Sequence, residues 1–187
     1  KGFVPTKKWK KERFGTSWLV GDTLNVGIGQ GFSLATPLQL AVMTARLASG
    51  KEVTPNIIKN PNKNADNPKA LSIKENTLVA IRKGMFNVLN EKEGTAFNFR
   101  TTDKNFLIAG KTGTSQVRRI TREEREEGVI KNEDLPWKMR DHALFTCFAP
   151  YKNPQYALSV VVEHGGSGSK VAAPIARDIM LFQLYGG

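Results

Sequence analysis

The sequence predicts an α+β fold made of helices, then three antiparallel strands and a closing helix. Apolar residues at helical spacing dominate the first half of the chain, whereas short apolar runs typical of strands begin only after Asn105. A last, largely apolar helical segment opens at Pro174. Helices followed by neighbouring strands indicate an α+β layer arrangement, and 187 residues with 40% hydrophobic content suffice for one core of ordinary size.

The first predicted helix has a clear start. Thr36 can cap it, Pro37 suits the first helical position, and Gln39 completes a capping box. Gly50 follows the predicted end of the helix. The apolar residues between these boundaries recur at helical spacing, and they are Leu38, Ala41, Val42, Ala45 and Ala48.

A second helix is predicted to begin at a capping box of Ser72 and Glu75 and to end near Asn90, followed by a turn at residues 94–96. The chain before the first helix is expected to be irregular over residues 1–24 and a loop over residues 25–35. The Asn- and Pro-rich residues 59–69 are expected to form an exposed loop. The glycines near residue 29 lack the spacing and the preceding strand of a dinucleotide-binding loop.

Three apolar runs predict the strands. Residues 106–110 form a buried-strand pattern that leads directly into the sequence Lys-Thr-Gly-Thr-Ser at 111–115. Residues 143–148 and 156–163 flank a turn-like segment, which predicts a hairpin. Residues 165–168 are expected to be a flexible loop before the closing helix.

A charged block at residues 118–140 is predicted to be an insertion between strands. Arg119 and Glu123, and also Arg122 and Glu126, lie four residues apart, as in an exposed helix or a long solvated loop. Such pairs stabilise a helix by only ~0.2–0.5 kcal/mol each. We therefore interpret the block as structural or as a partner surface, without chemistry of its own.

The formal net charge is +11, and six of the first thirteen residues are basic. This pattern fits a solvated basic surface, an arm for nucleic acid, or a surface that faces an anionic membrane or cell-wall polymer. Few aromatic residues lie between the basic ones, and no nucleic-acid-binding motif follows. We therefore expect no nucleic-acid partner.

Cysteine and histidine offer little for catalysis or metal binding. Cys147 is the single cysteine, so the chain has no internal disulfide, and its strand position predicts apolar packing. His142 and His164 lack the spacing of metal ligands, so no metal site and no cofactor are expected. No apolar run approaches the ~20 residues that span a bilayer.

The Lys-Thr-Gly triplet carries the chemistry of the chain. The ammonium of Lys111 can favour an anionic partner beside a serine nucleophile and help to move a proton. Gly113 lets a substrate backbone lie close to the strand, and the threonine hydroxyls can donate to a carboxylate. A backbone N–H here can face a developing oxyanion, and such a donor typically contributes ~3 kcal/mol to transition-state stabilisation.

The triplet belongs to an ordered set of five motifs, and this set resembles the penicillin-binding proteins over almost the whole chain. The motifs lie, in order, at residues 29–31 (Gly-Gln-Gly), 35–41 (Ala-Thr-Pro-Leu-Gln-Leu-Ala), 94–96 (Gly-Thr-Ala), 109–114 (Ala-Gly-Lys-Thr-Gly-Thr) and 163–176. Finer features at residues 13–15 and 21–31 resemble the elongation-type class B group, penicillin-binding protein 2. The resemblance implies the transpeptidase fold shared with serine β-lactamases, here only its C-terminal part.

The resemblance implies a peptidoglycan D,D-transpeptidase, in which a serine forms an acyl-enzyme with a stem peptide and β-lactams acylate the same serine. Lys111 would line the cleft, and Thr112 and Thr114 would meet the substrate carboxylate. The backbone N–H of Thr114 would form half of the oxyanion hole. Gly113 would leave room for the peptide along the strand.

The chain departs from the family pattern because it lacks a Ser-x-Asn motif. Its one Ser-x-x-Lys, from Ser167 to Lys170, follows the last strand instead of opening a helix upstream of the triplet, so we interpret it as accidental. The nucleophile and two strands of the sheet would then lie upstream. Residues 1–187 would form the C-terminal portion of a single transpeptidase domain that is inactive alone and prone to aggregate.

The resemblance also implies partners and a location. The partners would be stem peptides, β-lactams, the upstream half of the same domain, and a glycosyltransferase and membrane scaffold of the elongation complex. The protein would lie on the periplasmic face of the inner membrane, held by an N-terminal segment absent from this sequence. A β-lactam sensor module, a serine β-lactamase-like fragment and a basic nucleic-acid-binding protein are the alternatives.

Overall fold

The computed structural model describes residues 1–58, 68–118 and 120–186. The chain divides into two compact units, Lys1–Gln39 and Leu40–Gly187. Most of the predicted loop at 59–69 lies outside the described residues. Among those described, no helix is both long enough and apolar enough to cross a membrane.

The first unit contains two short helices, α1 (Lys7–Phe14) and α2 (Val20–Gly27), so the expectation of irregular chain over residues 1–24 is wrong. Local capping explains α1, because the Thr6 side chain accepts a hydrogen bond from the Trp9 N–H at 3.1 Å. Gly15, with φ of +68°, ends the helix in the left-handed region. Apolar periodicity is weak in so short and basic a helix, which is why the pattern did not indicate it.

Aromatic side chains form a partly exposed cluster in the first unit. Trp9 contacts Phe3, Phe14 and Phe32 with ring centroids 4.7, 5.5 and 5.2 Å away. The backbones of Phe3 and Leu34 also pair, with N···O distances of 2.7 and 2.9 Å. These contacts tie the two ends of the unit to its first helix.

An ion pair between Lys10 and Asp22 links α1 to α2. Both side chains are largely buried, and the Asp22 carboxylate also accepts the Leu19 N–H at 2.7 Å at the start of α2. The hydrogen bond from Lys10, followed by that from Leu19, lowers the pKa of Asp22.

Acidification should therefore loosen the first unit. A carboxyl with a lowered folded-state pKa contributes stability above its ordinary pKa of about 3.9, and this contribution is lost as the pH falls through the lower folded value. In a Trp137→Phe background the fluorescence comes from Trp9 and Trp18, both in the first unit, and can report the change; the Trp18 indole N–H donates to the Thr23 hydroxyl at 2.8 Å. Asp22→Asn should remove this acid step, and an unchanged step in that variant would contradict the assignment.

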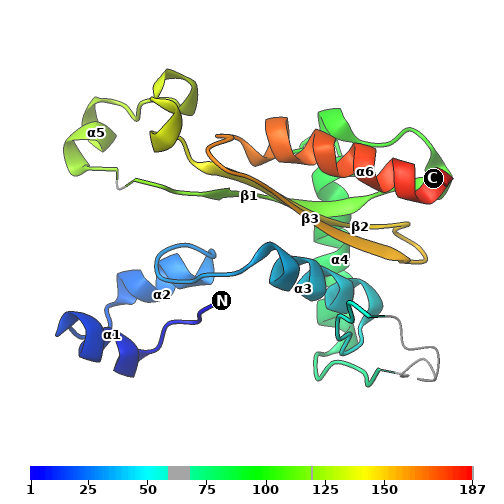
Figure 1. The fold of residues 1–187 in the computed structure, drawn as a ribbon, viewed down its shortest axis with the longest axis horizontal. Coiled ribbons are helices and arrows are strands. Elements are labelled where there is room, and N and C mark those ends of the chain that lie inside the picture. Colours follow the sequence, from blue (N-terminus) through cyan, green and yellow to red (C-terminus); the bar gives the residue numbers. More distant parts are fainter. Residues whose placement is uncertain (59–67, 119, 187) are drawn as a thin grey trace. The chain divides into compact units, whose positions relative to one another are not determined.

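The second unit is built on an antiparallel sheet of three strands in the order β1-β2-β3 (Figure 1). The strands are β1 (Ala109–Ser115), β2 (His142–Ala149) and β3 (Tyr156–Val162). The closing helix is α6 (Ala173–Tyr185). The predicted order of three antiparallel strands and a closing helix is confirmed, although β1 starts later than residue 106 because Lys104–Phe106 forms a 3₁₀ turn, η2.

The two faces of the sheet bury different side chains because strand residues alternate. On one face, Phe145 and Cys147 pack with Ala176 and Met180 of α6. On the other, Phe148 and Ala109 pack with residues of α3 (Pro37–Ser49) and α4 (Glu75–Asn90). Figure 1 shows α6 over the first face and α3 on the opposite side of the sheet.

The first predicted capping box is confirmed and the second is wrong. The Thr36 N–H donates to the Gln39 side chain at 3.0 Å, and the Gln39 N–H donates to the Thr36 hydroxyl at 3.2 Å. In α4 the N-cap residue is Lys74, whose side chain makes no capping hydrogen bond. Ser72 lies too early because the helix begins only at Glu75.

Residues between β1 and β2 form α5 (Arg122–Glu127) and two 3₁₀ turns, η3 (Asn132–Asp134) and η4 (Trp137–Met139). Arg122 pairs with Glu126 at 2.9 Å, as predicted, whereas the Arg119–Glu123 pair includes a residue outside the described ones. Asp141 holds this segment at its base, because its carboxylate accepts the Val117 N–H at 3.3 Å and the Asn132 amide at 3.0 Å.

Gly168 opens a π-helix, η5 (Gly168–Ala172), so the flexible loop predicted at 165–168 is in part wrong. The Ser167 hydroxyl caps this helix by accepting the Lys170 N–H at 3.3 Å. His164, just before it, has φ of +54°, in the left-handed region that non-glycine residues rarely adopt. The segment after β3 is thus folded back over the sheet by local hydrogen bonds.

Candidate active site

The Lys-Thr-Gly triplet lies in β1, at one edge of the sheet. Because side chains alternate along a strand, Lys111 and Gly113 face one side of the sheet and Thr112 and Thr114 face the other. In the part of the chain that the structure describes, β2 is the one strand that pairs with β1. β1 is thus an edge strand in the described sheet, and the Asn90 side chain bonds to it at the Ile108 carbonyl.

The backbone of β1 turns the N–H of Thr114 toward that outer edge. The Leu107 carbonyl accepts from Tyr151, on the side of β2, whereas the Ile108 carbonyl accepts from the Asn90 side chain at 3.0 Å. Successive residues of an antiparallel strand direct their N–H and C=O groups to opposite sides. Even-numbered residues such as Ile108 and Thr114 thus point away from β2.

The Lys111 side chain is exposed, and its ammonium donates to the Thr112 carbonyl at 2.8 Å. An ammonium carries three donors. Among the described residues no other bond to this ammonium exists, so its other N–H groups can meet a substrate or a serine. Lys111 thus presents a cation at the surface of the strand.

Below Lys111 a buried hydroxyl pair fixes the sheet. Thr146 is the cross-strand partner of Lys111, and its hydroxyl contacts the hydroxyl of Thr44, which is fully buried. Thr44 also donates to the Leu40 carbonyl at 2.8 Å. A buried polar pair with all partners in place holds α3 against the strand that supports the triplet.

Thr112 has a partner that the sequence patterns do not reveal. Its hydroxyl lies 3.1 Å from the hydroxyl of Thr95, in the Gly-Thr-Ala turn. When Thr95 donates, the Thr112 O–H is free to donate to a carboxylate, because a hydroxyl both donates and accepts. Thr95 is therefore a positioning residue for Thr112.

Two glycines allow close packing around the triplet. A Cβ at Gly110 would lie 2.6 Å from the ring of Phe145 and 2.8 Å from the Thr146 carbonyl oxygen. A Cβ at Gly168 would lie 2.5 Å from the Leu144 carbonyl oxygen and 3.1 Å from the Gly113 nitrogen. The start of η5 thus rests directly on the backbone of the triplet.

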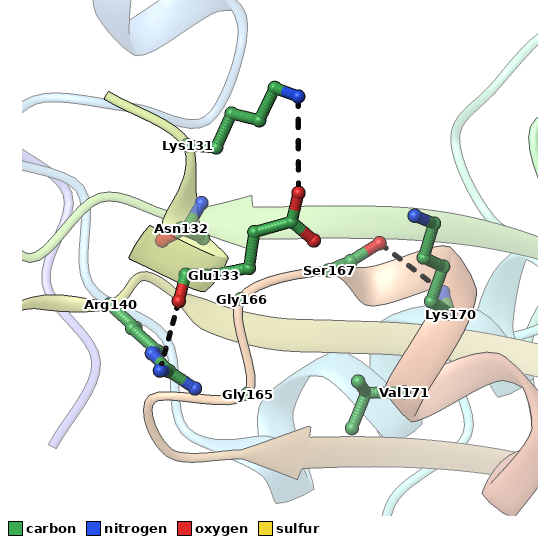
Figure 2. Close-up of a pocket in the computed structure, with 9 residues that line it drawn as sticks. All are labelled: Lys131, Asn132, Glu133, Arg140, Gly165, Gly166, Ser167, Lys170 and Val171. Carbon is green, nitrogen blue, oxygen red and sulfur yellow. Dashed lines mark hydrogen bonds and ion pairs between the residues drawn. The ribbon is translucent and has the colours of Figure 1, made fainter. Parts of the chain in front are cut away.

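The Ser167–Lys170 motif has a structural explanation. The Ser167 hydroxyl lies 3.2 Å from the Ser169 hydroxyl and caps η5 through the Lys170 backbone N–H (Figure 2). A serine nucleophile needs a base in hydrogen-bonding reach of its hydroxyl. The contacts here involve the backbone of Lys170, as expected for a cap.

Cys147 is fully buried in β2, as predicted, and burial raises the pKa of its thiol to about 12. Since the thiolate is the reactive form, native protein should resist iodoacetamide at pH 8, and guanidinium-unfolded protein should take up one carbamidomethyl group per Cys147 by intact mass. Stoichiometric labelling of the native protein would contradict this burial.

Among residues 1–58, 68–118 and 120–186, no cluster of His, Cys, Asp and Glu could hold a metal ion.

Sequence reasoning singled out the Gly-Thr-Ala motif at residues 94–96 but assigned no role to Thr95, and it did not find the Thr44–Thr146 pair. The only local signal of this pair is a polar residue type within an apolar segment. The contact joins segments far apart in the chain, because Thr44 lies 102 residues from Thr146. No local pattern carries such a pairing.

The chain belongs to the penicillin-binding protein transpeptidase domain family, whose model matches residues 3–181. It is similar to the protein named peptidoglycan D,D-transpeptidase MrdA from Haemophilus influenzae, with 37% identity over 97% of this chain and 28% of that protein. The protein of the same name from Escherichia coli K12 is 33% identical over 96% of this chain and 29% of its own length. The chain thus spans less than a third of these relatives.

Solved structures confirm the predicted fold class and the similarity to penicillin-binding protein 2. The Helicobacter pylori PBP2 in a complex with MreC is 39% identical, with a TM-score of 0.79 over 98% of this chain and 31% of that one. The Pseudomonas aeruginosa PBP2 in complex with WCK 5153 is 36% identical, with a TM-score of 0.70 over 96% of this chain and 37% of that one.

Proposed function

We propose that this chain forms one wall of the active site of a peptidoglycan D,D-transpeptidase. The observation that carries the proposal is the Lys-Thr-Gly triplet on an outer strand edge, with the N–H of Thr114 turned away from β2. The relatives named peptidoglycan D,D-transpeptidase, which match over 96–97% of this chain, support it.

In the proposed reaction a serine attacks the penultimate D-Ala carbonyl of a stem peptide and expels the terminal D-Ala. An amine of a neighbouring stem then attacks the acyl-enzyme and makes the crosslink. The stem lies along the outer edge of β1, where Gly113 leaves room for it. Thr112 and Thr114 hold its carboxylate, and the Thr114 N–H stabilises the oxyanion.

Lys111 provides the positive charge of this wall. Its ammonium lies beside the serine of the Ser-x-Asn motif, favours the anionic partner and helps to move the proton. The serine nucleophile, its lysine and the Ser-x-Asn motif belong to the upstream half of the domain in this proposal. The chain alone therefore has no acyl-enzyme activity.

The upstream half also completes the fold. It contributes two strands to the sheet, and β3 has a free edge for them because, in the described residues, it pairs with β2 alone. Large apolar side chains exposed on this chain support such a cover, among them Val20, Leu24, Ile28 and Phe182.

We place the whole protein on the periplasmic face of the inner membrane, anchored by an N-terminal segment, with β-lactams as inhibitors. A glycosyltransferase and a membrane scaffold of the elongation complex are its proposed partners. The proposal of a protein partner is supported by the similar Helicobacter pylori protein, which was solved in a complex with MreC.

Intact mass after incubation with benzylpenicillin tests the proposed function. This chain alone should gain no adduct, whereas the full-length protein should gain one penicilloyl group. An adduct on this chain alone would require a nucleophile within it, and substitution of Ser167 would then locate it. If correctly folded full-length protein gains no adduct, the transpeptidase proposal is excluded.

A further inference from the structure

A pocket with a cavity volume of about 360 Å³ lies between two segments that flank the sheet (Figure 2). One wall comes from the segment between β1 and β2, and the other from the turn and π-helix after β3. The side chains of Lys131, Asn132, Glu133, Arg140, Lys170 and Val171 line it.

The pocket carries an excess of positive charge. Lys131, Arg140 and Lys170 line it together with a single acid, Glu133. The Lys131 ammonium lies 4.0 Å from the Glu133 carboxylate, and both side chains are more than 70% exposed, so this pair is weak. Within the part of the chain that the structure describes, the ammonium of Lys170 has no ion-pair partner.

Arg140 is held in place without losing its charge. Its Nε donates to the Leu135 carbonyl at 3.0 Å, and its Nη2 donates to the Glu133 carbonyl at 3.2 Å. Neutral carbonyl groups orient a guanidinium but do not neutralise it. Arg140 therefore contributes a fixed positive charge, which raises the potential of the pocket for anions.

The backbone of the turn after β3 offers little to a ligand. Its N–H groups at Gly165, Gly166 and Ser167 donate to the carbonyls of Val162, Asp141 and Gly165, respectively. A ligand in the pocket must therefore be recognised by the cationic side chains. Val171 adds an apolar wall against which methylene groups can pack.

The pocket is joined to the triplet by a rigid contact. Gly168, next to the lining residue Ser167, rests on the backbone of Gly113. Asn132, in the opposite wall, is fixed by Asp141, with bonds of 2.8 and 3.0 Å in the two directions. Both walls are thus set relative to β1, along which the proposed peptide lies.

We propose that this pocket binds a carboxylate on a side chain of the stem peptide, next to the D-Ala-D-Ala end that Thr112 and Thr114 hold. The inference rests on the proposed function and extends it to substrate selection. Lys131 and Lys170 bind the carboxylate, and Arg140 supplies the surrounding positive potential. A volume of about 360 Å³ leaves room for a peptide side chain.

Two peptides that differ in one group test the inference on the full-length protein. Acetyl-L-Glu-D-Ala-D-Ala carries the carboxylate, and acetyl-L-Gln-D-Ala-D-Ala carries the corresponding amide. Each peptide is measured by how strongly it slows acylation by a fluorescent penicillin. The glutamate peptide should bind about fivefold more tightly at low salt, as one solvent-accessible ion contact allows, and the ratio should shrink as salt rises.

Charge-removing variants locate the effect. In the double variant Lys131→Gln and Lys170→Gln, the ratio of the two affinities should fall to about one. Lys138→Gln is the matched control, because Lys138 is an exposed lysine of the same segment that does not line the pocket, and it should keep the ratio.

Two results would overturn the inference: equal binding of both peptides by the unchanged protein, or a ratio that survives in the double variant. If benzylpenicillin acylates the full-length protein but the two peptides bind equally, the pocket assignment is refuted and the proposed function stands. Failure of benzylpenicillin to acylate the folded full-length protein refutes the proposed function, and the pocket assignment with it.

Discussion

Lys111→Ala in the full-length protein should lower the rate constant of acylation by benzylpenicillin by about 10²–10⁴-fold, which is the usual contribution of a positioned proton-transfer group. The side chain is exposed, and within the described residues its ammonium bonds to the neighbouring Thr112 carbonyl alone, so its loss should leave the fold intact. Stopped-flow acylation gives the rate, and a thermal melt checks the fold.

Lys152→Ala is the control for Lys111→Ala. Lys152 is exposed in the turn between β2 and β3, and its loss should change the acylation rate by less than about twofold, as expected for an exposed charge remote from the chemistry. A Lys111→Ala protein that is acylated as fast as the unchanged protein would remove Lys111 from the proposed mechanism. An equal loss in both variants would point to a general effect of charge.

Gly168→Ala should destabilise the domain by about 1–3 kcal/mol, as an overpacked site does, and should also slow acylation. The added Cβ would meet the Leu144 carbonyl oxygen at 2.5 Å and the Gly113 nitrogen at 3.1 Å. These atoms are backbone, so β1 or η5 must shift, and a shift of β1 displaces the triplet. Thermal melting and acylation rates of the same full-length preparation measure both effects.

Gly84→Ala is the matched control, since Gly84 lies in α4 and its Cβ would meet nothing within 4 Å. This variant should be stabilised by roughly 0.5–1 kcal/mol, because alanine suits a helix interior better than glycine. A Gly168→Ala protein as stable and as reactive as this control would show that η5 does not rest on β1.

The sequence predicted the elements whose signals are local. Thr36 and Gln39 cap α3 as their spacing requires, and β2 and β3 form the hairpin indicated by two apolar runs around a turn. The short helix α1 escaped prediction because aromatic contacts of Trp9 and the Lys10–Asp22 pair, rather than apolar periodicity, stabilise it.

The candidate site was only partly predictable, for the same physical reason. Lys111 and the residues after it form a contiguous motif that follows an apolar run, and such a motif can be recognised from the sequence alone. Two other contacts depend on how distant segments pack. The Thr95 hydroxyl bonds to the Thr112 hydroxyl, and Gly168 packs against the backbone of Gly113. The cationic pocket likewise arises where two segments separated along the chain form opposite walls.

The hydrogen bonds of Asp141 allow the segment between β1 and β2 to change in length during evolution. Asp141 binds Val117 and Asn132, so the segment between β1 and β2 is closed at its base. The outer part of this segment takes no part in strand pairing. Lengthening a closed loop costs only about 0.6 kcal/mol per doubling. Insertions and deletions among family members should therefore accumulate beyond this base, around α5, where new surface can be acquired while the strand register stays the same.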